Sequence, residues 1–229
     1  MSDSINLPIL PLPEVVFFPH TVLPMIVVEP SYIKMIRDCI KKDHSLVISM
    51  AEPIGTSEDG EHYTPQAIAT MGKPMMLEDL EDGSIRVIIT GQQRVELVSV
   101  EQNLPYLVYR VRLLPDQKES QLMELEGPQI ERLRSLLNAW IDDSIYDSLE
   151  RETFLESLDS LHHLIDYVSM YLINDRLMKQ IVLENRSLHD RVQQLYSLLR
   201  GDYPDCEDSL VALAMKDYES VELRSKLVH

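Results

Sequence analysis

The pair His162-His163, followed by Asp166, comes nearest to a metal site in this sequence. His162 and Asp166 are four residues apart, so on a helix their side chains would lie on one face. A zinc site needs three or four ligands, and no third ligand stands at a suitable spacing from this pair. We therefore interpret these residues as solvent-exposed side chains of a helix and expect no metal ion.

Acidic pairs and cysteines are the next candidates for chemistry. Glu78-Asp79 and Glu81-Asp82 could act as general acid and base, but they flank a predicted tight turn, where charges keep the turn hydrated. No pocket is indicated that would shift a carboxyl pKa. The two cysteines, Cys39 and Cys206, are far apart and lack a second cysteine or histidine at ligand spacing. We expect ordinary thiols, no cofactor and no catalytic residue.

Nucleotide chemistry is also unsupported by the sequence. A phosphate-binding loop of the Gly-x-x-x-x-Gly-Lys-Ser/Thr type holds phosphates with backbone N–H groups and a lysine. Gly72-Lys73 is the nearest approach, but Pro74 follows it and no glycine stands at the required distance before it. We therefore expect neither ATP binding nor ATP hydrolysis.

Two short apolar runs suit a binding role better than a catalytic one. Methionine side chains adapt to partners of different shape, and a strand broken by proline leaves backbone groups free to pair with an added strand. Such a surface would suit promiscuous recognition of unfolded segments. The alternative is that alternate residues of each run fill the core. The predicted peptide-binding residues are Phe17, Phe18 and Pro19 near the first bend, and Met71, Met75 and Met76 around Pro74.

Composition and charge narrow the class of partner. The chain has 21 basic and 38 acidic residues, a formal net charge of −17. Such a surface repels phosphate backbones, whose binding depends on lysine and arginine, so we expect no nucleic-acid partner. No apolar run approaches the roughly 18 residues of a membrane helix, and no basic segment followed by an apolar one begins the chain. We expect a cytoplasmic protein that does not bind membranes.

Proline and glycine divide the chain into two halves. Twelve of the 13 prolines and six of the seven glycines lie at or before Pro128. Before it, short apolar runs between turn residues predict strands, with one helix over 32–42 capped by Ser31. Asp82-Gly83 predicts a tight hairpin turn between strands at 75–80 and 85–90. After Pro128 the apolar period becomes three or four, which predicts a helical bundle.

The expected fold class is therefore α+β. We expect a β-rich subdomain over residues 1–118 and a helical subdomain over 119–229, packed as one unit. Asn174 is expected to cap one helix, with Leu177, Ile181 and Leu183 as its apolar stripe. The tail from residue 202 contains a short apolar stretch, 210–215, which we expect to form a short final helix that packs on the bundle or occupies the binding site.

The order and spacing of several motifs resemble the N-terminal domain of Lon proteases. The motifs are Leu7-Pro-Ile-Leu-Pro-Leu12, Val15-Val-Phe-Phe-Pro19, Leu23-Pro-Met25, Ala67-Ile-Ala-Thr-Met-Gly72, the run from Leu80 to Val95 with Arg94 as the matching arginine, and Lys179-Gln180, Leu183-Glu184, Arg191, Leu195 and Leu198-Leu199. The resemblance covers residues 5 to about 200. It implies a PUA-like pseudo-barrel followed by a helical subdomain, which engages substrates in the full protease.

We therefore expect a stand-alone, non-enzymatic peptide- or protein-binding module without ATPase or protease domains. Its expected partners are unfolded or regulatory polypeptides, with a Lon-type protease as a further candidate. Two alternatives stay open. Nucleic-acid binding is suggested by the likeness of PUA-like barrels to RNA-binding ones, against the acidic charge. A small-molecule or enzymatic pocket in the cleft between the two subdomains is compatible with the fold resemblance.

Overall fold

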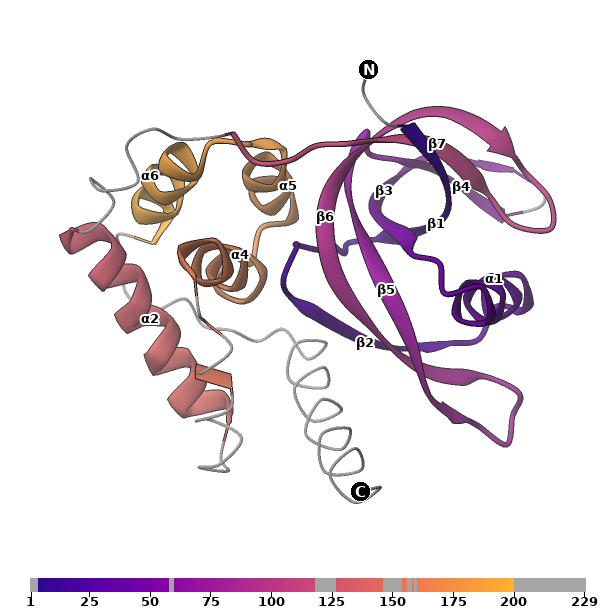
Figure 1. Ribbon diagram of the computed structural model, residues 1–229, viewed down its shortest axis with the longest axis horizontal. Coiled ribbons are helices and arrows are strands. Elements are labelled where there is room, and N and C mark those ends of the chain that lie inside the picture. The colour runs from indigo at the N-terminus through magenta and orange to yellow at the C-terminus, as the bar shows by residue number, and fades with distance from the viewer. Residues whose placement is uncertain are drawn as a thin grey trace. The chain divides into compact units, whose positions relative to one another are not determined.

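The computed structural model describes residues 4–57, 60–117, 127–145, 154, 155, 158 and 160–199. The chain forms two compact units, Met1–Pro115 and Asp116–His229. Within the described residues, unit 1 contains seven strands and one helix, and unit 2 contains four helices. The predicted α+β class is confirmed (Figure 1).

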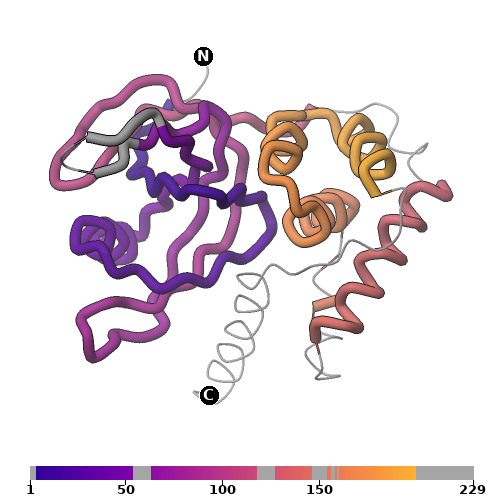
Figure 2. The backbone as a smooth tube through the Cα atoms, turned by 180° about the vertical axis from the view of Figure 1, so that it is seen from behind, coloured from indigo at the N-terminus to yellow at the C-terminus, as the bar shows by residue number. Residues whose placement is uncertain are grey.

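Five strands of unit 1 close into a barrel. They are β1 (Ser4–Pro13), β7 (Val108–Leu113), β6 (Ile85–Gln102), β5 (Ile68–Asp79) and β3 (Leu46–Ser57). Neighbouring strands in this order are antiparallel, and a parallel pairing of β1 with β3 completes the ring. Figure 2 traces this backbone, in indigo to magenta, as it returns on itself. Two further strands extend the barrel, because β4 (Gly60–Pro65) pairs with β3 and β2 (Val22–Val27) pairs with β6.

Strand β1 accommodates its prolines by changing neighbours halfway. Residues 4–8 pair with β7, and residues 9–13 pair with β3. Proline lacks the N–H that a strand with two neighbours would need, so it is confined to edge-like positions. Because each half of β1 has one neighbour in these pairings, Pro8, Pro11 and Pro13 fit a strand that still lies within a closed barrel.

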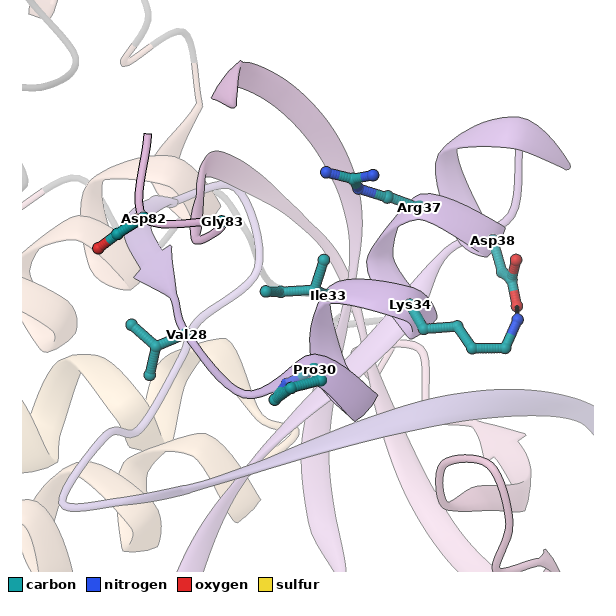
Figure 3. A pocket seen from close by; sticks show the side chains of 8 residues that line it. All are labelled: Val28, Pro30, Ile33, Lys34, Arg37, Asp38, Asp82 and Gly83. Atoms are coloured by element: carbon teal, nitrogen blue, oxygen red, sulfur yellow. Dashed lines mark hydrogen bonds and ion pairs between the residues drawn. The ribbon is translucent and has the colours of Figure 1, made fainter. Parts of the chain in front are cut away.

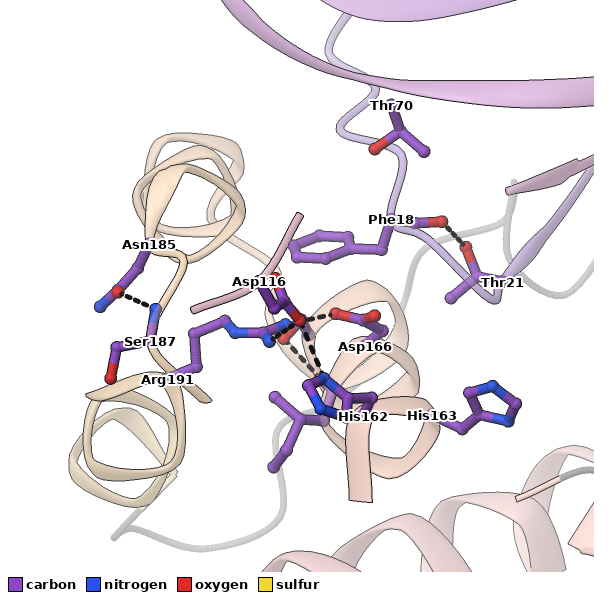
Figure 4. Close-up of polar contacts among 12 residues, drawn as sticks. Phe18, Thr21, Thr70, Asp116, His162, His163, Asp166, Asn185, Ser187 and Arg191 are labelled. Atoms are coloured by element: carbon purple, nitrogen blue, oxygen red, sulfur yellow. Dashed lines mark hydrogen bonds and ion pairs between the residues drawn. The ribbon is translucent and has the colours of Figure 1, made fainter. Parts of the chain in front are cut away.

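The connection from β1 to β2 crosses directly over two glycines that face each other in the sheet, Gly72 of β5 and Gly91 of β6. A Cβ atom on Gly91 would lie 2.3 Å from the Phe18 carbonyl oxygen, and one on Gly72 would lie 3.2 Å from Cε1 of the Phe17 ring. The Gly91 N–H donates to the Thr21 carbonyl at 2.8 Å, and Thr21 Oγ1 donates to the Phe18 carbonyl at 2.7 Å (Figure 4). The absence of side chains at these glycines therefore lets the crossing segment approach the sheet.

A predicted hairpin turn and a predicted helix are both present in unit 1. The turn between β5 and β6 has Gly83 at φ +86°, which confirms the role predicted for Asp82-Gly83. Helix α1 (Pro30–Lys41) packs against β5. Its N-cap is Glu29, with Pro30 in the first turn, so the prediction that Ser31 caps this helix is wrong. Proline suits that first turn because its missing N–H would have no helical partner there.

Unit 2 is a bundle of the helices α2 (Pro128–Ser144), α4 (Leu161–Leu172), α5 (Arg176–Glu184) and α6 (Leu188–Leu198). Helix α2 packs against α4 and α6, and α5 packs against α4 and α6 (Figure 1). In the core, Trp140 of α2 stacks on Tyr171 of α4 with ring centroids 4.9 Å apart. Helix α5 begins at Asp175, whose carboxylate accepts from two backbone N–H groups, so Asn174 is not its cap. The predicted short helix at 210–215 lies outside the described residues.

Candidate functional site

The six residues predicted to bind peptides do not form one exposed surface. Phe17, Phe18 and Pro19 are buried. Met71 packs against the barrel core, and Met76 is half-buried. Met75 alone among the six has an exposed side chain, at 49% of its full accessibility. The binding role of these residues stays a prediction, and the structure offers Met75 as the member best placed to contact a partner.

Met75 belongs to a row of apolar side chains on the sheet. It lies opposite Ile88 of β6, which lies opposite Pro24 of β2. Residues directly opposite on neighbouring strands point to the same face, and so do residues two apart on one strand. Ile26, 50% exposed, therefore joins this face. We call Pro24, Ile26, Met75 and Ile88 the sheet patch.

An open pocket of about 620 Å³ lies between the end of β2, helix α1 and the β5–β6 turn. Figure 3 shows its lining side chains around Ile33. They are Val28, Pro30, Ile33, Lys34, Arg37, Asp38, Asp82 and Gly83.

The charged groups of this pocket are satisfied by their neighbours. Lys34 Nζ lies 3.1 Å from Asp38 Oδ2, which also accepts from the Tyr106 hydroxyl at 3.0 Å. These two donors hold the pKa of Asp38 below its ordinary value. Hydrogen bonds from Ser84 do the same for the pKa of Asp82. Both carboxyl groups are therefore ionised at neutral pH, and neither is suited to donate a proton as a general acid.

A second pocket, of about 360 Å³, lies between α5 and α6. We call it the α5–α6 groove, and none of the described residues that line it is charged. They are Met178, Ile181, Val182, Gln193, Gln194, Ser197 and Leu198. Three large apolar side chains of this lining are exposed to solvent, at 39% for Met178, 49% for Ile181 and 43% for Leu198. Leu177, which lies one helical turn before Ile181 on α5, is 51% exposed.

The sequence interpretation missed this groove because α5 is apolar on two sides. We predicted that Leu177, Ile181 and Leu183 form its apolar stripe, but the structure buries Val182 and Leu183 and leaves Leu177 and Ile181 exposed. Val182 and Leu183 already supply the apolar side chains that α5 buries, so the apolar residues at positions 177 and 181 exceed what packing requires. The signal available in the sequence was therefore an apolar arc wider than a single packing face requires.

The helix α6 side of the groove is anchored by amide groups. Gln193 exchanges two side-chain hydrogen bonds with Gln129 of α2, at 2.9 and 3.2 Å. The side-chain oxygen of the neighbouring Gln194 is buried and accepts no hydrogen bond from the described part of the chain.

A buried ion cluster holds α6 in place within unit 2 (Figure 4). Arg191 is fully buried, with Nη1 at 2.8 Å from Asp166 Oδ1 of α4 and Nη2 at 2.6 Å from Asp116 Oδ2. His162 Nδ1 lies 2.8 Å from the same Asp116 oxygen. Our prediction that His162 and Asp166 are exposed was therefore wrong for Asp166, which is fully buried because Arg191 pairs with it.

This cluster is suited to stability rather than to chemistry. Its four groups belong to three separate segments, so the ion pairs join α4, α6 and the start of unit 2. Among the described residues, no group of three or more His, Cys, Asp or Glu side chains could hold a metal ion.

The helices in the described part of the chain are too short or too polar to span a membrane.

Comparison with known proteins gives a consistent family. The model of the ATP-dependent protease La (LON) substrate-binding domain matches residues 6–201. The Lon protease of Buchnera aphidicola (subsp. Acyrthosiphon pisum) is 27% identical over 210 residues, and that of Escherichia coli K12 is 23% identical over 207 residues. Each alignment covers 88% of this chain but 26% and 25% of the relative. The chain thus spans about a quarter of the length of these relatives.

Solved structures show that the fold is shared. A Lon N-terminal domain protein from Xanthomonas campestris matches with a TM-score of 0.60 at 19% identity, over 84% of this chain and 98% of that one. The N-terminal domain of the Mycobacterium avium complex Lon protease matches with a TM-score of 0.62 at 14% identity, over 86% and 100%. Together with the family match over most of its length, these findings show that the chain belongs to the LON substrate-binding domain family.

Proposed function

We propose that this protein is a non-catalytic module that binds polypeptides, and that the α5–α6 groove is its principal contact surface. The groove carries the proposal because it combines a defined concavity, an uncharged lining and exposed apolar side chains. A groove between two helices suits an apolar segment in helical conformation. The family description as a substrate-binding domain supports the same function.

The expected affinity is weak. Full burial of a large apolar side chain contributes about 1.5–3 kcal/mol, so covering four half-exposed ones contributes roughly 3–6 kcal/mol. Association itself costs about 4–15 kcal/mol, and further contacts must supply the remainder. We expect dissociation constants of about 10 μM to 1 mM for a short segment, a net free energy of roughly −7 to −4 kcal/mol, most of which these further contacts must supply. Weak, adaptable contacts of this kind suit unfolded or regulatory polypeptides, and a Lon-type protease is a further candidate partner.

The proposal also includes the type of the barrel, the division into subdomains, the class of partner and the cellular location. We assign the closed barrel of unit 1 to the PUA-like type and treat the two units as a β-rich and a helical subdomain. The net charge of −17 disfavours nucleic acid as the partner. In this proposal the protein acts in the cytoplasm, by binding alone.

A binding assay with matched charge substitutions tests the proposal. The probe is a second protein that is kept permanently unfolded by reduction and carboxymethylation and carries a fluorescent label. Its fluorescence anisotropy measures how tightly it is bound by the wild-type chain and by the Ile181→Asp and Met75→Asp variants. Ala139→Asp is the control, because it places the same charge on an exposed position of α2. We expect Ile181→Asp to weaken binding about tenfold and Ala139→Asp to leave it unchanged, since a charge in the groove must be desolvated by the occupant.

The alternative outcomes separate the surfaces. Weakening by Met75→Asp and not by Ile181→Asp would move the site to the sheet patch and refute the groove as the principal surface. If wild type binds no unfolded protein up to millimolar concentration, polypeptide binding itself is wrong. Fluorescence of the single tryptophan, Trp140, which is buried in unit 2, reports whether the helical variants are folded.

A further inference from the structure

The chain continues past the family match directly from the rim of the α5–α6 groove. Ser197 and Leu198, at the end of α6, line the groove. The family match ends at residue 201, and residues 202–229 follow it. Any apolar segment in this tail is therefore tethered next to an apolar groove of the same chain.

The tail sequence contains such a segment. Residues 209–215 carry no charge, and apolar side chains recur at the spacing of one helix face from Leu210 to Val221. They are Leu210, Leu213, Ala214, Tyr218 and Val221. The face opposite them carries Ala212 and Glu219. This pattern is that of a helix which buries one side against a partner.

The tether has a suitable length. Eleven residues lie between Leu198 and Leu210, and a random-coil linker of that length would span on average roughly 20 Å. Helix α6 has 11 residues and is therefore about 16 Å long. The segment can thus turn back and run along α6. A tether matched to its span gives an effective concentration in the millimolar range.

The segment also matches the groove chemically. An uncharged stretch meets a lining without charged residues, so no charge is desolvated.

We propose that residues 209–221 dock as a helix in the α5–α6 groove of the same chain and compete there with polypeptide partners. Docking stands independently of the proposed function, whereas competition rests on it. With an effective concentration of about 1 mM and an intrinsic dissociation constant near 0.1 mM, the groove is occupied about nine-tenths of the time. Partners then bind about tenfold more weakly than to an empty groove.

Hydrogen exchange on the full chain tests docking. Leu213→Asp places a charge on the apolar face, and Ala212→Asp places the same charge on the opposite face. We expect Leu213→Asp to accelerate exchange of the amides in α5 several-fold and Ala212→Asp to leave it at the wild-type rate. In an Ile181→Asp background, Leu213→Asp should have no further effect, because the groove is already disrupted. Equal exchange in the Leu213→Asp and Ala212→Asp variants would overturn docking.

Affinity for the labelled unfolded protein tests competition separately. If the tail competes, the Leu213→Asp variant binds this probe about tenfold more tightly than wild type or Ala212→Asp. Accelerated exchange with unchanged probe affinity would overturn competition and place the partner site elsewhere, while docking would stand. If Leu213→Asp leaves hydrogen exchange unchanged while Ile181→Asp still weakens binding of the probe, docking of the tail is overturned and the proposed function stands.

Discussion

The buried cluster around Arg191 allows a quantitative test of what holds the helical unit together. Arg191 and Asp166 are both fully buried, and their side chains are 2.8 Å apart. Replacing Arg191 by Met keeps most of the side-chain volume but removes the cation, so Asp166 loses its ion-pair partner inside the unit. Removing one partner of a buried ion pair costs about 3–5 kcal/mol, more than the pair itself contributes when both partners are replaced.

Urea unfolding followed by Trp140 fluorescence measures this effect. Trp140 is the single tryptophan, lies in the core of unit 2 and stacks on Tyr171, so its signal reports this unit rather than the barrel. With a denaturant slope of about 2 kcal/mol per molar urea, Arg191→Met should lower the unfolding midpoint by about 1.5–2.5 M. Arg134→Met, on an exposed position of α2, should shift it by less than about 0.3 M.

The double variant provides the decisive comparison. In Asp166→Leu/Arg191→Met both members of this pair become apolar, and Asp116 keeps His162 as a partner. We expect the midpoint to recover by at least half of the loss seen in Arg191→Met. If Arg191→Met behaves like Arg134→Met, or if the double variant is as unstable as the sum of the single variants, the ion pair does not couple these helices as the structure implies.

Two further predictions concern the barrel. Gly91→Ala should destabilise unit 1 by about 2–4 kcal/mol in thermal unfolding, because its Cβ would meet the Phe18 carbonyl oxygen at 2.3 Å. The control Gly127→Ala meets no atom within 4 Å and should change stability by under about 1 kcal/mol. Equal shifts in the two variants would contradict the close approach of the β1–β2 connection to Gly91. Burial raises the pKa of Cys39 from 9.0 to about 11. The contribution of the protonated Cys39 thiol to stability is therefore complete below about pH 9 and is lost as the pH rises through 11. At pH 8, alkylation of Cys39 should be far slower in the native than in the urea-unfolded chain. Equal alkylation rates would refute the burial of Cys39.

The sequence predicts the local features of the fold well. The turn at Gly83 and the stripe of α2 follow from short-range rules, because turn geometry and helical period are set by neighbouring residues. Gly72 and Gly91 mark where that reasoning failed. We expected one strand to begin only at residue 75 and the next to end at residue 90, but β5 and β6 continue through Gly72 and Gly91. Their role depends on the segment around Phe18, more than 50 residues earlier in the chain, which a local pattern does not reveal.

The same limit applies to the candidate site. Asp166 looks like an exposed helix residue because its partner, Arg191, lies 25 residues later and belongs to another helix. Strand β4, with the sequence Gly-Glu-His-Tyr-Thr-Pro, lacks the apolar alternation that identifies a strand, and it exists because β3 offers it a backbone edge. Burial and pairing at these positions are therefore decided by long-range neighbours rather than by the residues themselves.

The polar contacts of α6 explain why an apolar groove can persist on the surface of unit 2. Arg191 is held by two carboxylates and Gln193 by Gln129, so the helix cannot rotate to bury its exposed residues without breaking these bonds. Helix α5 is fixed in a similar way by its Asp175 cap and by buried Val182 and Leu183. Leu198 and Ile181 consequently stay exposed. A partner that docks between them meets a preformed surface and loses little free energy in ordering it, which is the condition under which four modest apolar contacts can produce measurable binding.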